Sequence, residues 1–154
     1  MLGRTYDREN CSAARTLEIV GERWSLLIIR DALFAGATRF TEFQRALGIA
    51  PNILSNRLDM FVEAGLIRTR PLGDGHEMHE YVLTAKGREL QPVIIALAEW
   101  GDRWAAPGGP PIVYEHEGCY GRVRLHLGCQ HCDTEPGTDD VTTRPGPGAR
   151  PGRL

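Results

Sequence analysis

The segment from residue 38 to residue 84 constrains the fold most, because helical and strand periodicities follow each other there in a fixed order. At its start, Phe40, Phe43 and Leu47 recur at spacings of three and four, which is typical of one buried helix face. Thr41 is the expected N-cap of this helix. The pattern therefore predicts a short helix that ends at Leu47.

A tight turn and a second helix are predicted next. Gly48 gives the turn the backbone freedom that it needs. Pro51 suits the first turn of a helix, where its missing N–H group costs nothing. Leu54, Leu58 and Phe61 fall at i, i+4 and i+7, which predicts the face that this helix turns toward the core. The opposite side of the helix is then expected to face outward.

That outward side carries short polar side chains, namely Asn52, Ser55, Asn56 and Asp59. Asparagine can bond adenine through two hydrogen bonds and serine can reach bases or phosphates, so this face suits a DNA major groove. Arg57 lies at its edge and suits a phosphate. Pro51, at the start of the helix, belongs to the same candidate site. A plain solvated helix face is the alternative interpretation, and the hairpin that follows favours groove contact.

Two alternating strands complete the segment. The predicted strands are 66–72 and 79–84, with Gly73 and Gly75 at the turn between them. Arg68 and Arg70 alternate with other side chains and are expected to face the DNA backbone, whereas Asp74 and Glu77 at the tip would repel it. The order helix, turn, helix, hairpin predicts a winged helix-turn-helix, which places one helix where it can enter a major groove.

Helices are also predicted on both sides of this segment. Residues 11–20 and 24–34 read as two helices, with Arg30 and Asp31 on the solvent side of the second. From Ala85 the pattern predicts one long helix.

This long helix has Thr84 as its expected N-cap and a kink expected at Pro92. An apolar seam steps along it by three and four, formed by Leu90, Val93, Leu97, Trp100 and Trp104. Such a seam suits an interhelical contact, and two-fold pairs of chains read palindromic sites, so we expect a homodimer. Packing of the seam against the chain's own core is the alternative.

Composition and charge limit the classes of protein that need consideration. The 154 residues are 42% hydrophobic and 25% charged, which is ordinary for a globular domain, and the formal net charge is −2. No apolar run approaches the roughly 18 residues of a membrane span, and the N-terminus lacks the apolar stretch of a signal peptide, so a cytoplasmic location is expected. No Ser/His/Asp grouping or phosphate-binding glycine loop appears, so an enzyme is not expected.

Three of the four cysteines cluster near the end of the chain, in the pattern His116-x2-Cys119-x9-Cys129-x2-Cys132. Two short chelating pairs of soft donors are what tetrahedral zinc needs, and four protein ligands would make the site structural. The alternatives are free thiols in a flexible tail, a Cys129–Cys132 pair with a redox role, and His126 or His131 as the fourth ligand. No thioredoxin-like pattern surrounds the pair, which argues against a thiol–disulfide enzyme.

These patterns predict a mainly α fold with a small β-hairpin wing (α+β) and three segments. Residues 1–106 form the winged helix-turn-helix and dimerisation domain, 107–133 form a small Cys/His-containing appendage, and 134–154 form a disordered tail. Within the appendage, residues 110–116 and 121–127 alternate like short strands, which suggests a zinc-ribbon-like arrangement.

Residues 10–104 resemble the HxlR-type family of bacterial winged-helix transcription regulators, which are relatives of the MarR group. The matching stretches include CSAARTLEIVGERWSLLIIRDALFAGATRFTEFQRALGIAPNILSNRL, EAGLIRTR, EYVLTAKGREL and PVIIALAEWGDRW. The resemblance implies a homodimer, regulation of nearby genes, Asn52, Ser55, Asn56 and Arg57 in the groove, and Arg39 and Thr41 on phosphate. It also implies that Cys11 can sense oxidants, although a small residue that simply packs is the alternative. The wing tip departs from the family, which usually has proline and arginine there.

Many actinobacterial members of this family carry a similar Cys/His ending, usually with glycine directly after the knuckle cysteines, which correspond to Cys119 and Cys132 here. Tyr120 and Asp133 stand there in this chain. The sequence thus predicts a homodimeric regulator, more specifically a repressor, that binds double-stranded DNA at a pseudo-palindromic operator. An oxidant, a metal or a small-molecule effector would control it. The alternative is a winged-helix module for protein interaction or ligand sensing that does not bind DNA strongly.

Overall fold

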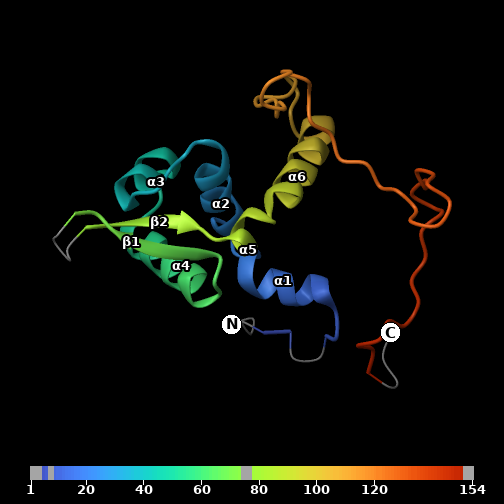
Figure 1. The fold of residues 1–154 in the computed structure, drawn as a ribbon, viewed down its shortest axis with the longest axis horizontal. Helices are drawn as coiled ribbons and strands as arrows, with labels where there is room; N and C mark the ends of the chain where they lie inside the picture. The colour runs from blue at the N-terminus through green and yellow to red at the C-terminus, as the bar shows by residue number, and fades with distance from the viewer. Residues whose placement is uncertain (1–4, 7–8, 74–77, 151–154) are drawn as a thin grey trace. The chain divides into compact units, whose positions relative to one another are not determined.

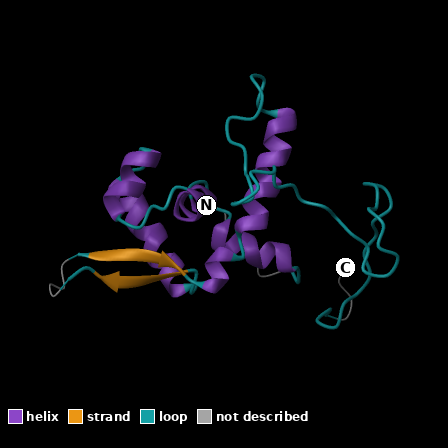
Figure 2. Ribbon diagram, turned by 45° about the horizontal axis from the view of Figure 1, so that its top comes forward, coloured by secondary structure: helices purple, strands orange, loops and turns teal. Residues whose placement is uncertain are grey.

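The computed structural model describes residues 5–6, 9–73 and 78–150. The chain divides into two compact units, residues 1–94 and 95–154. In chain order the elements are α1 (Ser12–Val20), α2 (Ser25–Phe34), α3 (Phe40–Leu47), α4 (Pro51–Glu63), β1 (Ile67–Pro71), β2 (His79–Leu83), α5 (Ala85–Arg88) and α6 (Gln91–Trp104). The mainly α fold with a two-stranded hairpin is therefore confirmed (Figures 1 and 2).

The first unit is organised around α4. Its apolar stripe of Leu54, Leu58 and Phe61 is fully buried, as the spacing predicts. Phe43 of α3 and Ile28 of α2 join it in one hydrophobic core. Burying side chains of this size stabilises the unit by about 2 kcal/mol each, so the stripe fixes which side of α4 faces out.

The turn between α3 and α4 follows the sequence prediction, but the start of α3 does not. Gly48 ends α3 in the left-handed conformation (φ 62°), and Pro51 occupies the first turn of α4. Thr41 is not the N-cap, because Arg39 occupies that position and Thr41 lies one residue inside the helix. The Glu42 carboxylate reaches back to accept the Arg39 and Thr38 backbone N–H groups at 3.0 and 2.9 Å, which is the contact that an N3 glutamate makes in a capping box.

The hairpin pairs β1 with β2 in antiparallel register, from Ile67 opposite Leu83 to Pro71 opposite His79. The Tyr81 N–H group donates to the Thr38 carbonyl at 2.7 Å, which ties β2 to the entry of α3. The strands also contact α4, α2 and α5. The predicted wing tip at 74–77, including Asp74 and Glu77, lies outside the described residues.

Asp31 differs from its prediction as a solvent-facing residue. It is 5% exposed, and its Oδ1 atom accepts a hydrogen bond from Arg30 Nε at 2.8 Å and lies 2.7 Å from the Nη2 atom of the same guanidinium. The burial of this acid is offset by the adjacent guanidinium, whose side chain stays 30% exposed. Helical spacing alone cannot detect such a neutralised pair.

The predicted long helix after Ala85 is in fact two helices. Thr84 caps α5 as predicted, accepting the Gly87 N–H group at 3.2 Å, but α5 ends at Arg88. Pro92 lies in the first turn of α6, where its missing N–H group is tolerated, so the chain breaks one turn before it. Leu90 lies between the helices and packs against the core of the first unit, rather than on a helical seam.

Beyond α6 the described chain, 105–150, has no helix or strand. The predicted short strands are reduced to one isolated bridge between Glu115 and Arg122. No described residue of this segment is buried. None of the described helices is long and apolar enough to cross a membrane.

Candidate nucleic-acid interface

The outward face of α4 is the centre of the candidate site. Asn52, Ser55 and Asn56 are exposed, on the side away from the buried stripe, as predicted. Amide and hydroxyl side chains offer both donors and acceptors, so they can match the edges of bases in a major groove. Because the stripe fixes the roll of the helix, these three side chains cannot turn inward without exposing the core.

The start of α4 adds a favourable electrostatic field. The Ala50 N-cap makes no side-chain hydrogen bond, and Pro51 occupies the first position, so no carboxylate covers this helix end. The N-terminus of a helix of 13 residues carries a partial positive charge and attracts phosphate. The α4 terminus therefore contributes to phosphate binding beside the polar face.

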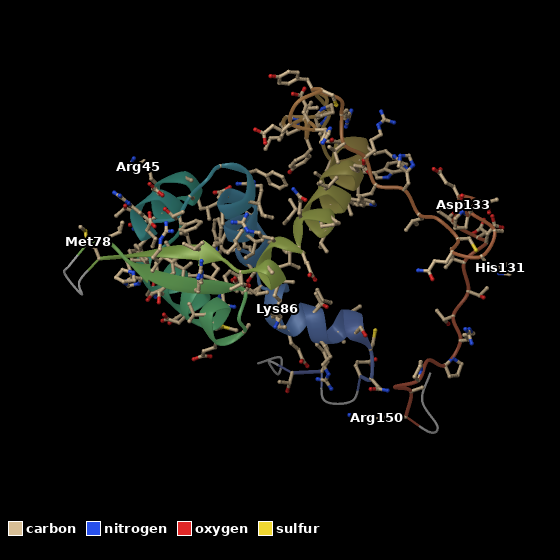
Figure 3. The ribbon with its side chains drawn as sticks, in the orientation of Figure 1. Arg45, Met78, Lys86, His131, Asp133 and Arg150 are labelled. Atoms are coloured by element: carbon tan, nitrogen blue, oxygen red, sulfur yellow. The ribbon has the colours of Figure 1, made fainter. Side chains whose placement is uncertain are left out.

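Exposed cations lie at the N-cap and in the last turn of α3. Arg39 and Thr41 are exposed, as a phosphate-binding role requires. Arg45, in the last turn of α3, is exposed as well and was missed as a site residue, although its place opposite the Phe40–Phe43 stripe was a usable signal. Figure 3 shows Arg45 and Met78 at one end of the first unit and Lys86 at the other.

Arg57 is not the free cation that the sequence suggested. Its side chain is 15% exposed, and its Nε lies 3.5 Å from a carboxylate oxygen of Glu22, in the loop between α1 and α2. The Glu22 carboxylate already balances much of the Arg57 charge, so Arg57 attracts a phosphate less strongly than an unpaired arginine would. Glu22 lies 35 positions earlier in the chain, so spacing within α4 gave no signal of the pair.

The two arginines of β1 also differ in their surroundings. Arg70 donates to Glu80 of β2 from Nε at 3.0 Å, and this guanidinium holds the pKa of Glu80 below its ordinary value. Arg68 lies opposite Val82 and is exposed, with no ion-pair partner among the described residues. Arg68 is therefore the strand cation with charge to spare for DNA.

The apolar seam of α6 is exposed. Val93, Leu97, Trp100 and Trp104 keep 39, 51, 65 and 69% of their surface accessible. At about 100° per residue these four side chains fall within about 60° of arc, so they form one stripe along the helix. Large apolar side chains in such an array are typical of a surface that a partner covers.

The cysteines occupy separate places. Cys11 is exposed at the N-cap position of α1, so it does not pack in the core. His116 and Cys119 lie together, with Nδ1 3.3 Å from Sγ, and Cys132 contacts Thr134 at 3.0 Å. The Thr134 hydroxyl and backbone N–H group lower the pKa of Cys132. In the part of the chain that the structure describes, no three His, Cys, Asp or Glu side chains converge on a common metal position.

Comparison with known proteins matches this architecture to one family. The model of the HxlR-like helix-turn-helix family matches residues 19–108. An HTH-type transcriptional regulator of Mycobacterium tuberculosis, Rv3095, is 46% identical over 91% of this chain and 89% of its own length. Because only 9% of this chain lies outside that match, the similarity extends well beyond α6.

Solved structures support the same grouping. The crystal structure of PA1607, described as a candidate transcription factor, has a TM-score of 0.80 and 36% identity, covering 90% of this chain and 97% of PA1607. The redox regulator HypR in its reduced form has a TM-score of 0.55 and 26% identity over 60% of this chain and 92% of its own. The chain therefore belongs to the HxlR-like helix-turn-helix family, whose members are DNA-binding transcription regulators and not enzymes.

Proposed function

We propose that this protein is a homodimeric transcription repressor that binds a pseudo-palindromic operator through α4. One observation carries the proposal: Asn52, Ser55 and Asn56 are exposed on a helix whose opposite stripe is fully buried. A rigid helix that presents amides and a hydroxyl reads bases in a major groove. Repression needs nothing more than occupancy of a site that overlaps a promoter.

The phosphate contacts are assigned to a small set of cations. The positive charge comes from Arg39 at the N-cap of α3, Arg45 of α3, Arg68 of β1 and the N-terminus of α4, with Thr41 as a hydroxyl donor. Arg57 and Arg70 contribute less, because Glu22 and Glu80 already pair with them. One chain therefore offers only a few phosphate contacts, and a dimer would offer twice as many.

Dimerisation is assigned to the seam of Val93, Leu97, Trp100 and Trp104. Burying these apolar side chains against the same stripe of a second copy removes them from water. The seam runs along one helix, so pairing through it would bring two α4 helices, one from each chain, to one operator. Leu90 is left out of this set, because it packs against its own core.

The test is a gel-shift titration with a labelled duplex from the region upstream of the protein's own gene, over a series of salt concentrations. Asn56→Ala should weaken binding to this duplex about 10-fold, as one lost base contact does, and leave binding to a random duplex unchanged. Arg39→Ala should weaken binding to both duplexes. Arg88→Ala is the matched control, since Arg88 is an exposed arginine in α5, outside α3, α4 and the hairpin strands.

A second function is a winged-helix module for protein interaction or ligand sensing. The observation that favours it is the neutralisation of Arg57 and Arg70 within the chain, which leaves fewer cations for DNA. This function takes precedence if the wild-type protein binds its upstream region no better than random duplex at every salt concentration.

Control by an oxidant is a separate part of the proposal. Cys11 is exposed, and HypR, a redox regulator, is among the similar structures. A thiol oxidant such as diamide should then change the gel shift of the wild-type protein and leave that of Cys11→Ser unchanged. An equal response of both proteins would remove Cys11 from this role.

A further inference from the structure

Two turns in the segment after α6 share one unusual backbone conformation. Tyr120 (φ 57°) and Asp133 (φ 56°) are the only non-glycine residues with positive φ in the described part of the chain. Each directly follows the second member of a chelating pair, Cys119 in one turn and Cys132 in the other. The two turns therefore repeat one local structure at both donor pairs.

The hydrogen bonds of the two turns also correspond. In the first turn, the Tyr120 N–H group donates to the His116 carbonyl at 2.9 Å, and the Gly121 N–H group donates to the Cys119 sulfur at 3.4 Å.

In the second turn, the Asp133 N–H group donates to the Cys129 carbonyl at 2.9 Å, and the Thr134 backbone donates to the Cys132 sulfur. Backbone N–H groups that donate to sulfur orient a cysteine as a metal ligand.

This conformation is costly, and no buried core among the described residues of the segment offsets its cost. The left-handed region costs a non-glycine residue about 1–2 kcal/mol, and such residues persist where the surroundings fix them. Yet no described residue between 105 and 150 is buried, and the segment has only the Glu115–Arg122 bridge. A segment without a core commonly depends on a metal or on disulfides for its order.

We propose that His116, Cys119, Cys129 and Cys132 bind one structural Zn²⁺ ion, with each turn supplying two of the four ligands. The His116 Nδ1 and Cys119 Sγ atoms lie 3.3 Å apart. Tetrahedral zinc, with bonds of about 2.0–2.1 Å to nitrogen and 2.3 Å to sulfur, sets these atoms about 3.5 Å apart, so the first pair already has the required spacing. Three thiolates and one imidazole leave no position for a substrate.

The two turns are not together in this structure, so zinc binding must bring them together. Cys119 and Cys129 are ten positions apart, and an extended linker of that length reaches up to about 33 Å. His126 is less suited as the fourth ligand, because its Nδ1 atom pairs with Glu135 at 2.7 Å. His131 stands between Cys129 and Cys132 in the sequence. Figure 3 shows it in the same turn as Asp133.

The first turn is tied to α6, which gives the zinc site a structural consequence. Arg122 pairs with Asp102 at 3.3 Å, and the Leu125 N–H group donates to Glu99 at 3.3 Å. At about 100° per residue, Glu99 and Asp102 lie across the helix from Trp100 and Trp104. Zinc would therefore fix residues 116–132 against one side of α6 and leave the apolar seam open for a second copy.

The test uses the full chain, purified with a reductant, and Zn²⁺ or Co²⁺ as the probe. Plasma mass spectrometry should find about one zinc per chain, and Co²⁺ should give the intense visible bands of a tetrahedral thiolate complex. Cys119→Ser and Cys132→Ser should each weaken Co²⁺ binding by at least 10-fold, and His116→Ala should do the same. Cys11→Ser and His126→Ala are matched controls that should bind metal as the wild type does.

A second pair of variants tests the turns themselves. Tyr120→Gly and Asp133→Gly keep all four ligands and remove the left-handed strain, so both should bind Co²⁺ at least as tightly as the wild type. Zinc below about half an equivalent, with no Co²⁺ bands after reconstitution, would overturn the proposal. So would loss of the bands in His131→Ala with His116→Ala unaffected. Metal binding is measured without DNA, so this outcome is independent of the gel shift.

Discussion

Gly87 lies in close contact with the backbone of Leu66 and the side chain of Leu83. A Cβ atom at this position would lie 2.2 Å from the Leu66 carbonyl oxygen and 2.9 Å from a Leu83 methyl group. Gly87→Ala should therefore lower the free energy of unfolding by about 2 kcal/mol or more, measured by urea denaturation.

The matched control is Gly101→Ala in α6, where a Cβ atom meets nothing within 4 Å. An alanine in a helix is favoured over glycine, so this variant should be neutral or more stable by up to about 1 kcal/mol. Equal effects of the two substitutions would contradict the close approach at Gly87.

Glu42 makes stability depend on acid pH. The Thr38 and Arg39 N–H groups lower the pKa of Glu42 from its ordinary value of 4.5. A carboxylate whose pKa is lower in the folded state stabilises the fold above its unfolded pKa, and this contribution disappears as the pH falls through the folded pKa. Glu42→Gln should thus destabilise the protein near neutral pH, with a difference from wild type that shrinks below about pH 4.5 in thermal melts.

Glu63→Gln is the comparison for this pH effect. Glu63 is an exposed glutamate at the end of α4, with no hydrogen bond or ion pair among the described residues. Its substitution should leave the pH profile of stability unchanged. A Glu42→Gln profile parallel to that of wild type from pH 7 to pH 3 would show that the N-terminal hydrogen bonds of α3 do not form.

Residue-level prediction from the sequence succeeded where one periodicity decided the outcome. Leu54, Leu58 and Phe61 are buried, and Asn52 and Asn56 are exposed, because burial of the stripe fixes the opposite face. Prediction failed for charges that a partner neutralises. Arg57 depends on a glutamate 35 positions away, and Asp31 depends on the side-chain conformation of its neighbour, and neither is visible as periodicity.

At the scale of elements, the hairpin separates a free arginine from a paired one. Arg68→Ala should reduce the slope of log affinity against log salt by about 0.9, as the loss of one phosphate contact does. Arg70→Ala should change the slope less, because Glu80 already engages Arg70 at 3.0 Å. Fluorescence anisotropy with the upstream duplex measures both slopes.

Glu80→Gln is the complementary variant, since it releases Arg70 and removes one negative charge from the hairpin. Its affinity for DNA should rise, and its salt slope should become steeper. Equal slopes for Arg68→Ala, Arg70→Ala and wild type would show that the hairpin does not contact the DNA backbone.

The order of elements was predictable, and their ends were less so. The helix-turn-helix and the hairpin follow local signals such as Gly48 and Pro51, which act within one turn of chain. One long helix with a kink at Pro92 was predicted, but the chain forms two helices that are separated before Pro92, because a proline is tolerated in the first turn of a helix. After α6, alternation predicted short strands at 110–116 and 121–127. No described residue there is buried, so the alternating side chains have no packed face that would stabilise strands.

At the scale of the whole molecule, the α6 seam should control assembly. Leu97→Glu places a charge in the exposed stripe and should shift sedimentation from dimer to monomer, with loss of operator binding. Arg103→Glu introduces the same side chain on α6 outside the stripe and should leave the dimer intact. A wild-type protein that sediments as a monomer at micromolar concentration would contradict this assignment.

The central claim is that two copies of α4 read one two-fold site, and footprinting of the upstream region tests it most directly. The account predicts protection of two half-sites about one helical turn apart, with two chains bound per duplex and both half-sites lost together in Asn56→Ala. Protection of a single half-site by one chain, or no protection at concentrations where the protein is dimeric, would contradict it.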